Sequence, residues 1–201
     1  MKLRHLASAA VLLLAAAAAQ AHAQSQGNTG VYFNPMATHI SNSQADNGTF
    51  SFLGANTTSR MFWGFQMGGY YDFFHAGPMA AGFTMRFSDE HAANAGIRNF
   101  QVGLRVAAPL SANNRIRPYA EVTVGDGSTK PEAATVRVSK AAYAVYGGVD
   151  YSLAKHIDFR AIEVGYGSLT TVSATTVGAG NGTTYPASKL LSFSSGFVFR
   201  F

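Results

Sequence analysis

Ten charged residues fall where their side chains could do chemistry inside a folded sheet. Five are basic and five acidic: Arg86, Arg105, Lys140, Arg160, Arg200, Asp72, Glu121, Asp150, Asp158 and Glu163. Carboxylates set beside cations can form an acid/base site or a gated path for ions. They can also neutralise one another, because a buried charge is costly unless it is paired. Balanced signs, with no histidine in the set, favour internal salt bridges.

A second candidate site is the run Thr38-His39-Ile40-Ser41-Asn42. Residues two apart on a strand share a face, so His39 could serve as the base for a nucleophilic Ser41. The run resembles the His-x-Ser-Asn motif of the outer-membrane lipid A deacylases, which implies a lipid-hydrolysing barrel. In that family the motif lies toward the C-terminal half, and here no nearby acidic residue is placed to orient His39. We therefore predict no catalytic residue, with the deacylase as an alternative.

Metal and cofactor sites are not indicated. The chain has no Cys, which excludes disulfides and thiolate sites, and its six His residues show no metal-ligand spacing. No phosphate-binding glycine motif is present. The formal net charge is +5, and without Lys2 and Arg4 of the expected signal peptide 13 basic residues face 10 acidic ones; this balance of +3 is too weak to indicate nucleic acid as a partner. We predict no metal and no cofactor.

The elements that position these residues are clearest at the C-terminus, in the segment Lys189 to Phe201. Counting by twos places Phe193, Phe197, Phe199 and Phe201 on one face, with small or charged residues on the other. An aromatic face ending in Phe resembles the closing strand of bacterial outer-membrane β-barrels. The resemblance implies that the barrel-assembly machinery recognises this strand through its end at Phe201.

Eight runs in all show the alternation of a strand. They are Gly30–Ile40, Met61–Phe74, Met79–Phe87, Ile97–Ala107, Arg117–Gly125, Arg137–Tyr151, Ile157–Gly167 and Lys189–Phe201. Every odd-numbered connection is longer than its even neighbours, which is typical of up-and-down barrels with short periplasmic turns and longer external loops. The seventh run changes phase, and a β-bulge near Ala161 would restore it. We predict an all-β fold: an eight-stranded antiparallel up-and-down transmembrane β-barrel.

The N-terminus has the pattern of a secretory signal peptide. Lys2 and Arg4 precede a short apolar stretch, Leu6 to Ala19, which is followed by Ala21-His22-Ala23. We expect cleavage before Gln24, which makes 1–23 a signal peptide and 24–201 one barrel domain.

The architecture resembles the small barrels of the OmpA, OmpX and opacity-protein type. That resemblance implies the bacterial outer membrane, with membrane lipids and lipopolysaccharide as surroundings. It also implies a non-catalytic surface, envelope-structural or adhesin-like role for long external loops, whose partner is not readable from the sequence. A narrow ion pore is one alternative, and a soluble periplasmic β-sandwich or lipocalin-like binder is another.

Overall fold

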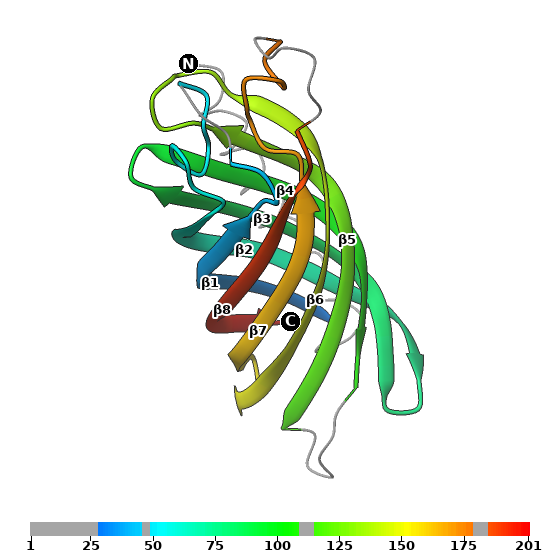
Figure 1. Cartoon of the computed structure of the whole chain (residues 1–201). Coiled ribbons are helices and arrows are strands. Elements are labelled where there is room, and N and C mark those ends of the chain that lie inside the picture. Colours follow the sequence, from blue (N-terminus) through cyan, green and yellow to red (C-terminus); the bar gives the residue numbers. More distant parts are fainter. Residues whose placement is uncertain (1–27, 46–48, 109–114, 179–184) are drawn as a thin grey trace, which may run out of the picture.

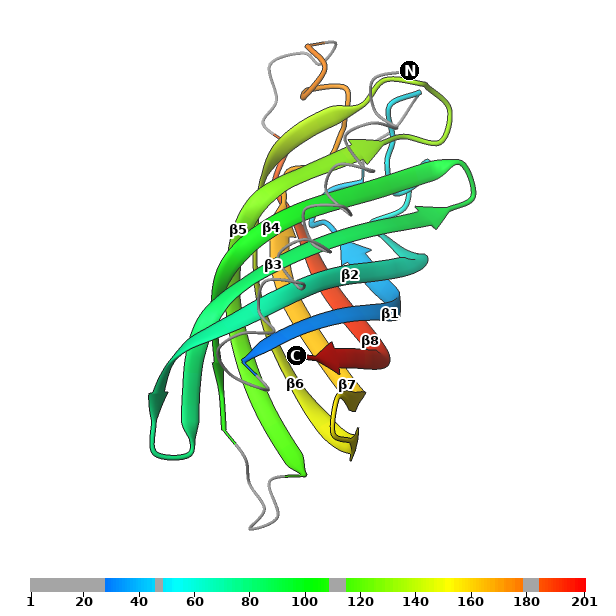
Figure 2. The ribbon, with the colours of Figure 1, turned by 180° about the vertical axis from the view of Figure 1, so that it is seen from behind.

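The computed structural model describes residues 28–45, 49–108, 115–178 and 185–201, so the expected signal peptide lies outside the described residues. Eight strands form one closed antiparallel barrel in chain order (Figures 1 and 2). They are β1 (Thr29–Ser41), β2 (Ser59–Ala76), β3 (Met79–Ala92), β4 (Ala95–Ala107), β5 (Ile116–Lys130), β6 (Val138–Ala154), β7 (Ile157–Leu169) and β8 (Ser188–Arg200). A single closed sheet confirms the predicted barrel, and the β-sandwich alternative is wrong.

Closure joins the first strand to the last. In Figure 1 the red β8 lies beside the blue β1, and Gly30 pairs with Arg200. At this end Phe201 N donates a backbone hydrogen bond to Thr29 O at 2.9 Å. We call this the inner end of the barrel, and the opposite end, where β1 reaches Ser41, the outer end.

The barrel wall has a polar inside and an apolar outside, as the alternation predicts. On β8, Ser192, Ser194 and Val198 are buried, while Phe193 and Phe197 are 44% and 48% exposed. The same holds on β2, where Gln66 is buried and Trp63 is 65% exposed. No helix in the described part of the chain is long and apolar enough to cross a membrane.

The strands are longer than predicted at the outer end. The segment expected to be the loop 88–96 belongs mostly to β3 and β4, which meet at the tight turn 93–94. Arg98 on β4 pairs with Asp89 on β3 in the register and bonds to it at 2.8 Å, so polar residues continue the ladder here. The predicted rule that odd connections are longer is therefore wrong: 93–94 is as short as the turn 77–78, and 131–137 is shorter than 108–115.

The predicted β-bulge is confirmed. Along β6, Val149 pairs with Ile162 and the next residue, Asp150, pairs with Arg160, so Ala161 has no partner of its own. The register of β7 with β8 shifts at the same place, between Arg160 and Glu163. The bulge lets Arg160 and Glu163 both point inward although they are three residues apart.

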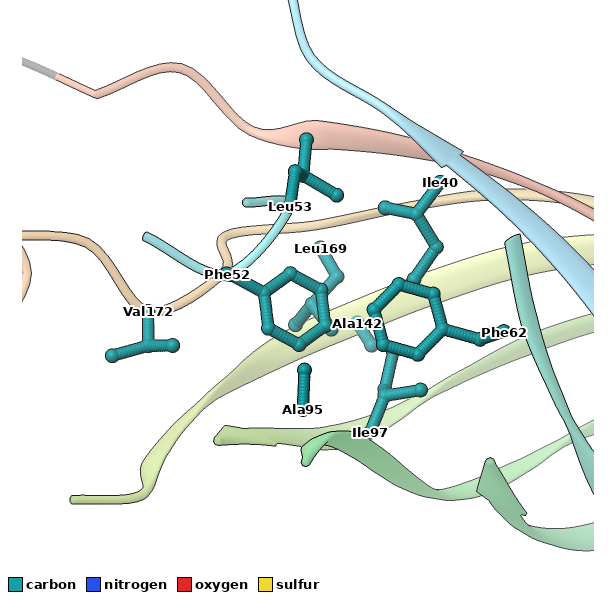
Figure 3. Packing of buried hydrophobic residues seen from close by; sticks show 9 residues of the cluster. All are labelled: Ile40, Phe52, Leu53, Phe62, Ala95, Ile97, Ala142, Leu169 and Val172. Carbon is teal, nitrogen blue, oxygen red and sulfur yellow. The ribbon is translucent and has the colours of Figure 1, made fainter. Parts of the chain in front are cut away.

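An apolar cluster closes the outer mouth of the barrel (Figure 3). Phe52 and Leu53, between β1 and β2, and Val172, after β7, reach into the mouth. They pack on side chains of the wall. We call this cluster the apolar plug; it comprises Ile40, Phe52, Leu53, Phe62, Ala95, Ile97, Ala142, Leu169 and Val172. The rings of Phe52 and Phe62 stack at 4.9 Å with an interplanar angle of 14°.

Candidate functional site

A closed ring of alternating charges crosses the lumen beneath the apolar plug. Its members are Arg86, Glu121, Arg105, Asp150, Arg160 and Glu163, in that order around the ring, and all six are buried. Each guanidinium contacts two carboxylates, and each carboxylate contacts two guanidinium groups. We call this set the arginine–carboxylate ring. Its three positive and three negative charges cancel, so the predicted internal salt bridges are present.

The contacts in the ring are close and supplemented by neutral donors. Arg105 Nη1 donates to Glu121 Oε1 at 2.8 Å, and Arg160 Nε donates to Asp150 Oδ1 at 2.9 Å. Glu163 accepts hydrogen bonds from Arg86 and Arg160, and it accepts another from Tyr119 Oη at 2.6 Å. A carboxylate bonded in this way is held in one orientation, which suits a structural role.

Tyrosine rings cover the guanidinium groups, a feature that the sequence analysis missed. Arg105 lies 4.0 Å from the centroid of Tyr119 and 4.1 Å from that of Tyr70, while Arg86 lies 3.7 Å from that of Tyr146. A cation over an aromatic face is stabilised most where water is excluded. The signal was available, because Tyr70 and Tyr119 have the inward phase of their strands.

Glycines opposite the tyrosines make room for these rings. A Cβ on Gly148 would come within 2.4 Å of Tyr119 Oη, and one on Gly68 within 2.5 Å of Tyr32 Oη. The bare inner wall at these two positions lets rings lie flat across a narrow lumen.

The remaining predicted charges do not belong to the ring. Arg200 pairs with Asp158 at 2.8 Å near the inner end, and Asp72 is buried nearby. Lys140 was predicted to point inward but is exposed, because it lies two residues into β6 at the outer end. Glu90 is fully buried and was missed, because β3 was predicted to stop at Phe87. Its inward phase with Arg86 would have identified it in a longer strand.

Two small cavities lie among the inward side chains of the described residues. The one beside the ring has a volume of about 10 Å³, and the one above it about 20 Å³. Each is about the size of one water molecule.

The outer wall carries a larger hollow, of about 590 Å³. Its lining includes Val31, Tyr71, Phe83 and Leu104 on the outward faces of four neighbouring strands. An apolar groove on a wall of this kind suits hydrocarbon chains rather than a polar substrate.

The candidate catalytic pair lies on the outer face of β1. His39 is level with Met61 and Leu191, and Ser41 with Ser59 and Lys189, in the two neighbouring strands. Within the described residues no hydrogen bond joins His39 to Ser41 and no carboxylate bonds to His39. Asn42 turns away from the pair: its Nδ2 donates to Pro186 O at 2.8 Å and to Ser188 Oγ at 3.0 Å.

Metal-binding clusters of three or more His, Cys, Asp or Glu side chains are absent from the described residues. His91 bonds to Asp89 at 3.0 Å on the outer face, and His156 contacts Arg200 O at 3.0 Å in a turn. Neither lies with further ligands. The absence of a metal or cofactor in the functional protein stays a prediction.

Comparison with known proteins gives one family and several similar folds. Residues 7–185 match the family described as the outer membrane protein beta-barrel domain. Among solved structures, the Neisserial surface protein A is similar with a TM-score of 0.57 at 12% identity, covering 89% of this chain and 100% of that one. No match is found among curated proteins.

A second similar fold is Ail, the attachment invasion locus protein of Yersinia pestis. Its TM-score is 0.52 at 10% identity, with 88% of this chain and 100% of Ail covered. Ail in complex with the heparin analogue sucrose octasulfate has a TM-score of 0.52 at 11% identity and the same coverage. At these identities the likeness concerns the fold alone.

Proposed function

The chain belongs to the outer membrane protein beta-barrel family and is a protein of the bacterial outer membrane, and we propose that it acts there as a non-catalytic surface barrel. Its lumen conducts neither ions nor solutes, and its outer rim and external connections meet partners. The observation that carries this proposal is double closure of the lumen. The apolar plug fills the mouth, and the neutral arginine–carboxylate ring fills the section below it.

Double closure argues against the narrow pore. An ion entering from outside would have to cross packed apolar side chains, where a bare charge is unstable. It would then meet three guanidinium groups whose charges are already matched by three carboxylates. We expect planar-bilayer recordings of the wild type to show no stable, long-lived conductance. A steady open channel would contradict the proposal.

The enzyme alternative is tested separately. We expect lipid A from cells that express the wild type to keep all its acyl chains, because no carboxylate of the described residues bonds to His39 to orient it. Mass spectra of lipid A from cells that express the wild type, Ser41→Ala and His39→Ala measure this. Loss of acyl chains that depends on both residues would overturn the non-catalytic assignment.

The outer end is basic, which suits anionic glycans. Among the described residues, six basic side chains lie there: Arg60, Arg98, Lys130, Arg137, Lys140 and Lys189. The acidic side chains exposed or partly exposed at the same end are Asp89, Asp126 and Glu132. Glu132 is bonded to Arg60 and Asp89 to Arg98, while Lys140 and Lys189 are exposed and have no ion pair within the described chain. We propose that this rim binds the phosphates of lipopolysaccharide; sulfated glycans share that chemistry, and a fold of this kind binds a heparin analogue in Ail.

Binding can be measured on the folded barrel in nanodiscs. The triple variant Arg137→Gln, Lys140→Gln, Lys189→Gln should bind lipopolysaccharide about tenfold more weakly than the wild type, with a smaller dependence on salt. Lys155→Gln, at the inner end, is the matched control. Heparin and dephosphorylated lipopolysaccharide as competitors distinguish the sources of the anion. Equal binding by wild type and triple variant would contradict this assignment.

Assembly provides a further proposed partner. We propose that the barrel-assembly machinery recognises β8, whose outward face presents Phe193, Phe197 and Phe199 and leads to Phe201. Phe201→Ser should lower the yield in the outer membrane but leave refolding in detergent unchanged. An unchanged yield would contradict a recognition role.

A further inference from the structure

Glu90 differs from every carboxylate of the arginine–carboxylate ring. Its side chain is fully buried, yet neither carboxylate oxygen accepts a hydrogen bond from the described residues. The side chains of Thr38 and Ser88 interact with it, but neither forms a hydrogen bond of normal geometry to its oxygens. An unpartnered buried carboxylate needs a compensating group.

No cation of the protein supplies that compensation. Arg86, four residues away on the same face of β3, is bonded to Glu121 and Glu163. The two other arginines of the ring are likewise shared between ring carboxylates. Within the described residues Glu90 forms no ion pair, so one negative charge is left unmatched above a neutral ring.

A cavity adjoins Glu90, and its lining combines oxygen-bearing side chains with apolar residues such as Met36 and Leu190. Its volume is about 20 Å³, room for one small occupant, and its lining includes Thr38, Asn99, Gln101 and Ser192. Thr38 Oγ1 and Asn99 Oδ1 are buried and have no hydrogen-bond partner. Asn99 Nδ2 donates to Ser88 Oγ at 3.1 Å, which leaves its carbonyl oxygen free.

The oxygen atoms around the Glu90 carboxylate indicate which kind of ion the cavity would bind. Hard cations prefer carboxylate, carbonyl and hydroxyl oxygens. One unmatched negative charge is neutralised by one positive charge, and a cavity the size of a water molecule suits a small ion. From this geometry we propose that Glu90, Thr38 and Asn99 bind a sodium ion inside the barrel.

The site lies between the two closures of the lumen. Glu90 pairs in the register with Ile97, and Thr38 lies two residues below Ile40; Ile97 and Ile40 belong to the apolar plug seen in Figure 3. Arg86 lies on the other side. The ion therefore exchanges with solvent only when the plug opens, and it acts as a structural ion that neutralises the lumen.

Sodium dependence of stability tests the proposal on the intact barrel in lipid vesicles. Thermal unfolding is compared in sodium, potassium and choline chloride at one ionic strength, so that general screening is equal. The melting temperature of the wild type should rise in sodium by roughly 3 to 6 °C for each tenfold increase above the dissociation constant. Potassium should give a smaller shift and choline none.

Glu90→Gln keeps the shape of the side chain and removes the charge. Its melting temperature should be the same in all three salts, while the control Glu132→Gln, an exposed residue, should keep the sodium response of the wild type. Thr38→Val removes one ligand, so the rise in its melting temperature should need a higher sodium concentration. This variant tests the proposal if Glu90→Gln does not fold. A wild type that melts alike in sodium and choline would overturn the proposal and show that a proton neutralises Glu90.

Discussion

At the scale of single residues, neutrality inside the barrel is achieved locally. Arg86, Arg105 and Arg160 each have two carboxylates, and the ring closes on itself without a leftover charge. Glu163 has the most partners, because Gln66, Tyr119 and Ser194 also bond to it. Removing one member therefore takes one of two counter-charges from each of its two buried neighbours.

Glu163→Ala tests this dependence. We expect a loss of roughly 3 to 5 kcal/mol in the free energy of unfolding, because Arg86 and Arg160 would each lose a buried counter-charge. Urea unfolding in lipid vesicles, followed by the fluorescence of the single tryptophan, Trp63, measures the loss. The control Glu132→Ala breaks an exposed pair with Arg60 and should cost less than about 1 kcal/mol. Equal effects would mean that the ring adds no stability.

The sequence predicted correctly which way a side chain points where the alternation along a strand determines that direction. Arg105 and Glu121 alternate with outward apolar residues, so their inward direction was readable. Lys140 and Glu90 were misassigned because direction alone does not say how far along the barrel a residue lies. The stacking of tyrosines on arginines depends on contacts between distant strands, and no local pattern encodes those contacts.

At the scale of elements, the bulge in β7 determines which residues reach the ring. If this sequence formed a regular strand with no bulge at Ala161, Arg160 and Glu163, three residues apart, would fall on opposite faces. One ring member would then face lipid. The phase change was visible in the sequence because the outward positions switch from Phe159 to Ile162.

Deletion of Ala161 should therefore be tolerated, because it removes the bulge and leaves Arg160 and Glu163 two residues apart, on the same face of a regular strand. Deletion of Val164, in the regular part of β7, should instead prevent folding, because it turns every residue on one side of the deletion to the opposite face. Refolding into detergent, scored as the fast-migrating band of unheated samples, measures both outcomes. Deletion of Ala133, exposed in the connection 131–137, should leave folding intact. An Ala161 deletion that does not fold would contradict this account of the bulge.

The connections were harder to predict than the strands. Phe52 and Leu53 are separated from the wall residues they pack on by polar, Gly-rich sequence. That sequence has the composition of an exposed loop, so it does not indicate that Phe52 and Leu53 are buried. The outer end of β3, from Ser88 to His91, is polar on both faces, so it resembled a loop. In both cases the deciding contacts join segments far apart in the chain.

Phe52→Asp should open the mouth. A carboxylate cannot replace a ring stacked on Phe62 inside an apolar cluster, so the connection 42–58 should leave the barrel. Limited proteolysis of the folded protein should then cut this connection much faster than in the wild type. Phe100→Ala, on the outward face of β4, is the control and should not change cleavage. Continued protection of Phe52→Asp would mean that the plug does not hold the connection.

At the scale of the whole molecule, the barrel is inverted relative to a soluble protein. Trp63, Phe83 and Leu104 are among many large apolar side chains that are half exposed or more, while charges fill the interior. Such a surface is stable only against hydrocarbon. The lipocalin-like alternative, which needs an apolar interior and a polar exterior, does not fit.

The purified mature protein should therefore need detergent, and it should migrate faster on a gel unheated than boiled. A closed barrel resists SDS because every strand is paired and no sheet edge is left open. Samples heated to temperatures between 25 and 100 °C and run on a gel show the temperature at which the fast-migrating folded band is replaced by the unfolded band. A monomer that stays soluble without detergent would contradict the membrane assignment.

The apolar plug joins three outer connections, through Phe52 and Leu53, Val136 and Val177, and Ala92 packs against it beside the fourth, the turn 93–94. The external surface is for this reason one composite unit and not four independent segments. An antibody raised against the folded protein should recognise discontinuous epitopes that linear peptides fail to mimic. Grafting a foreign sequence into one connection should alter the antigenicity of the others. Sequence drift in these connections is constrained at the few positions that point into the mouth and free at those that point away.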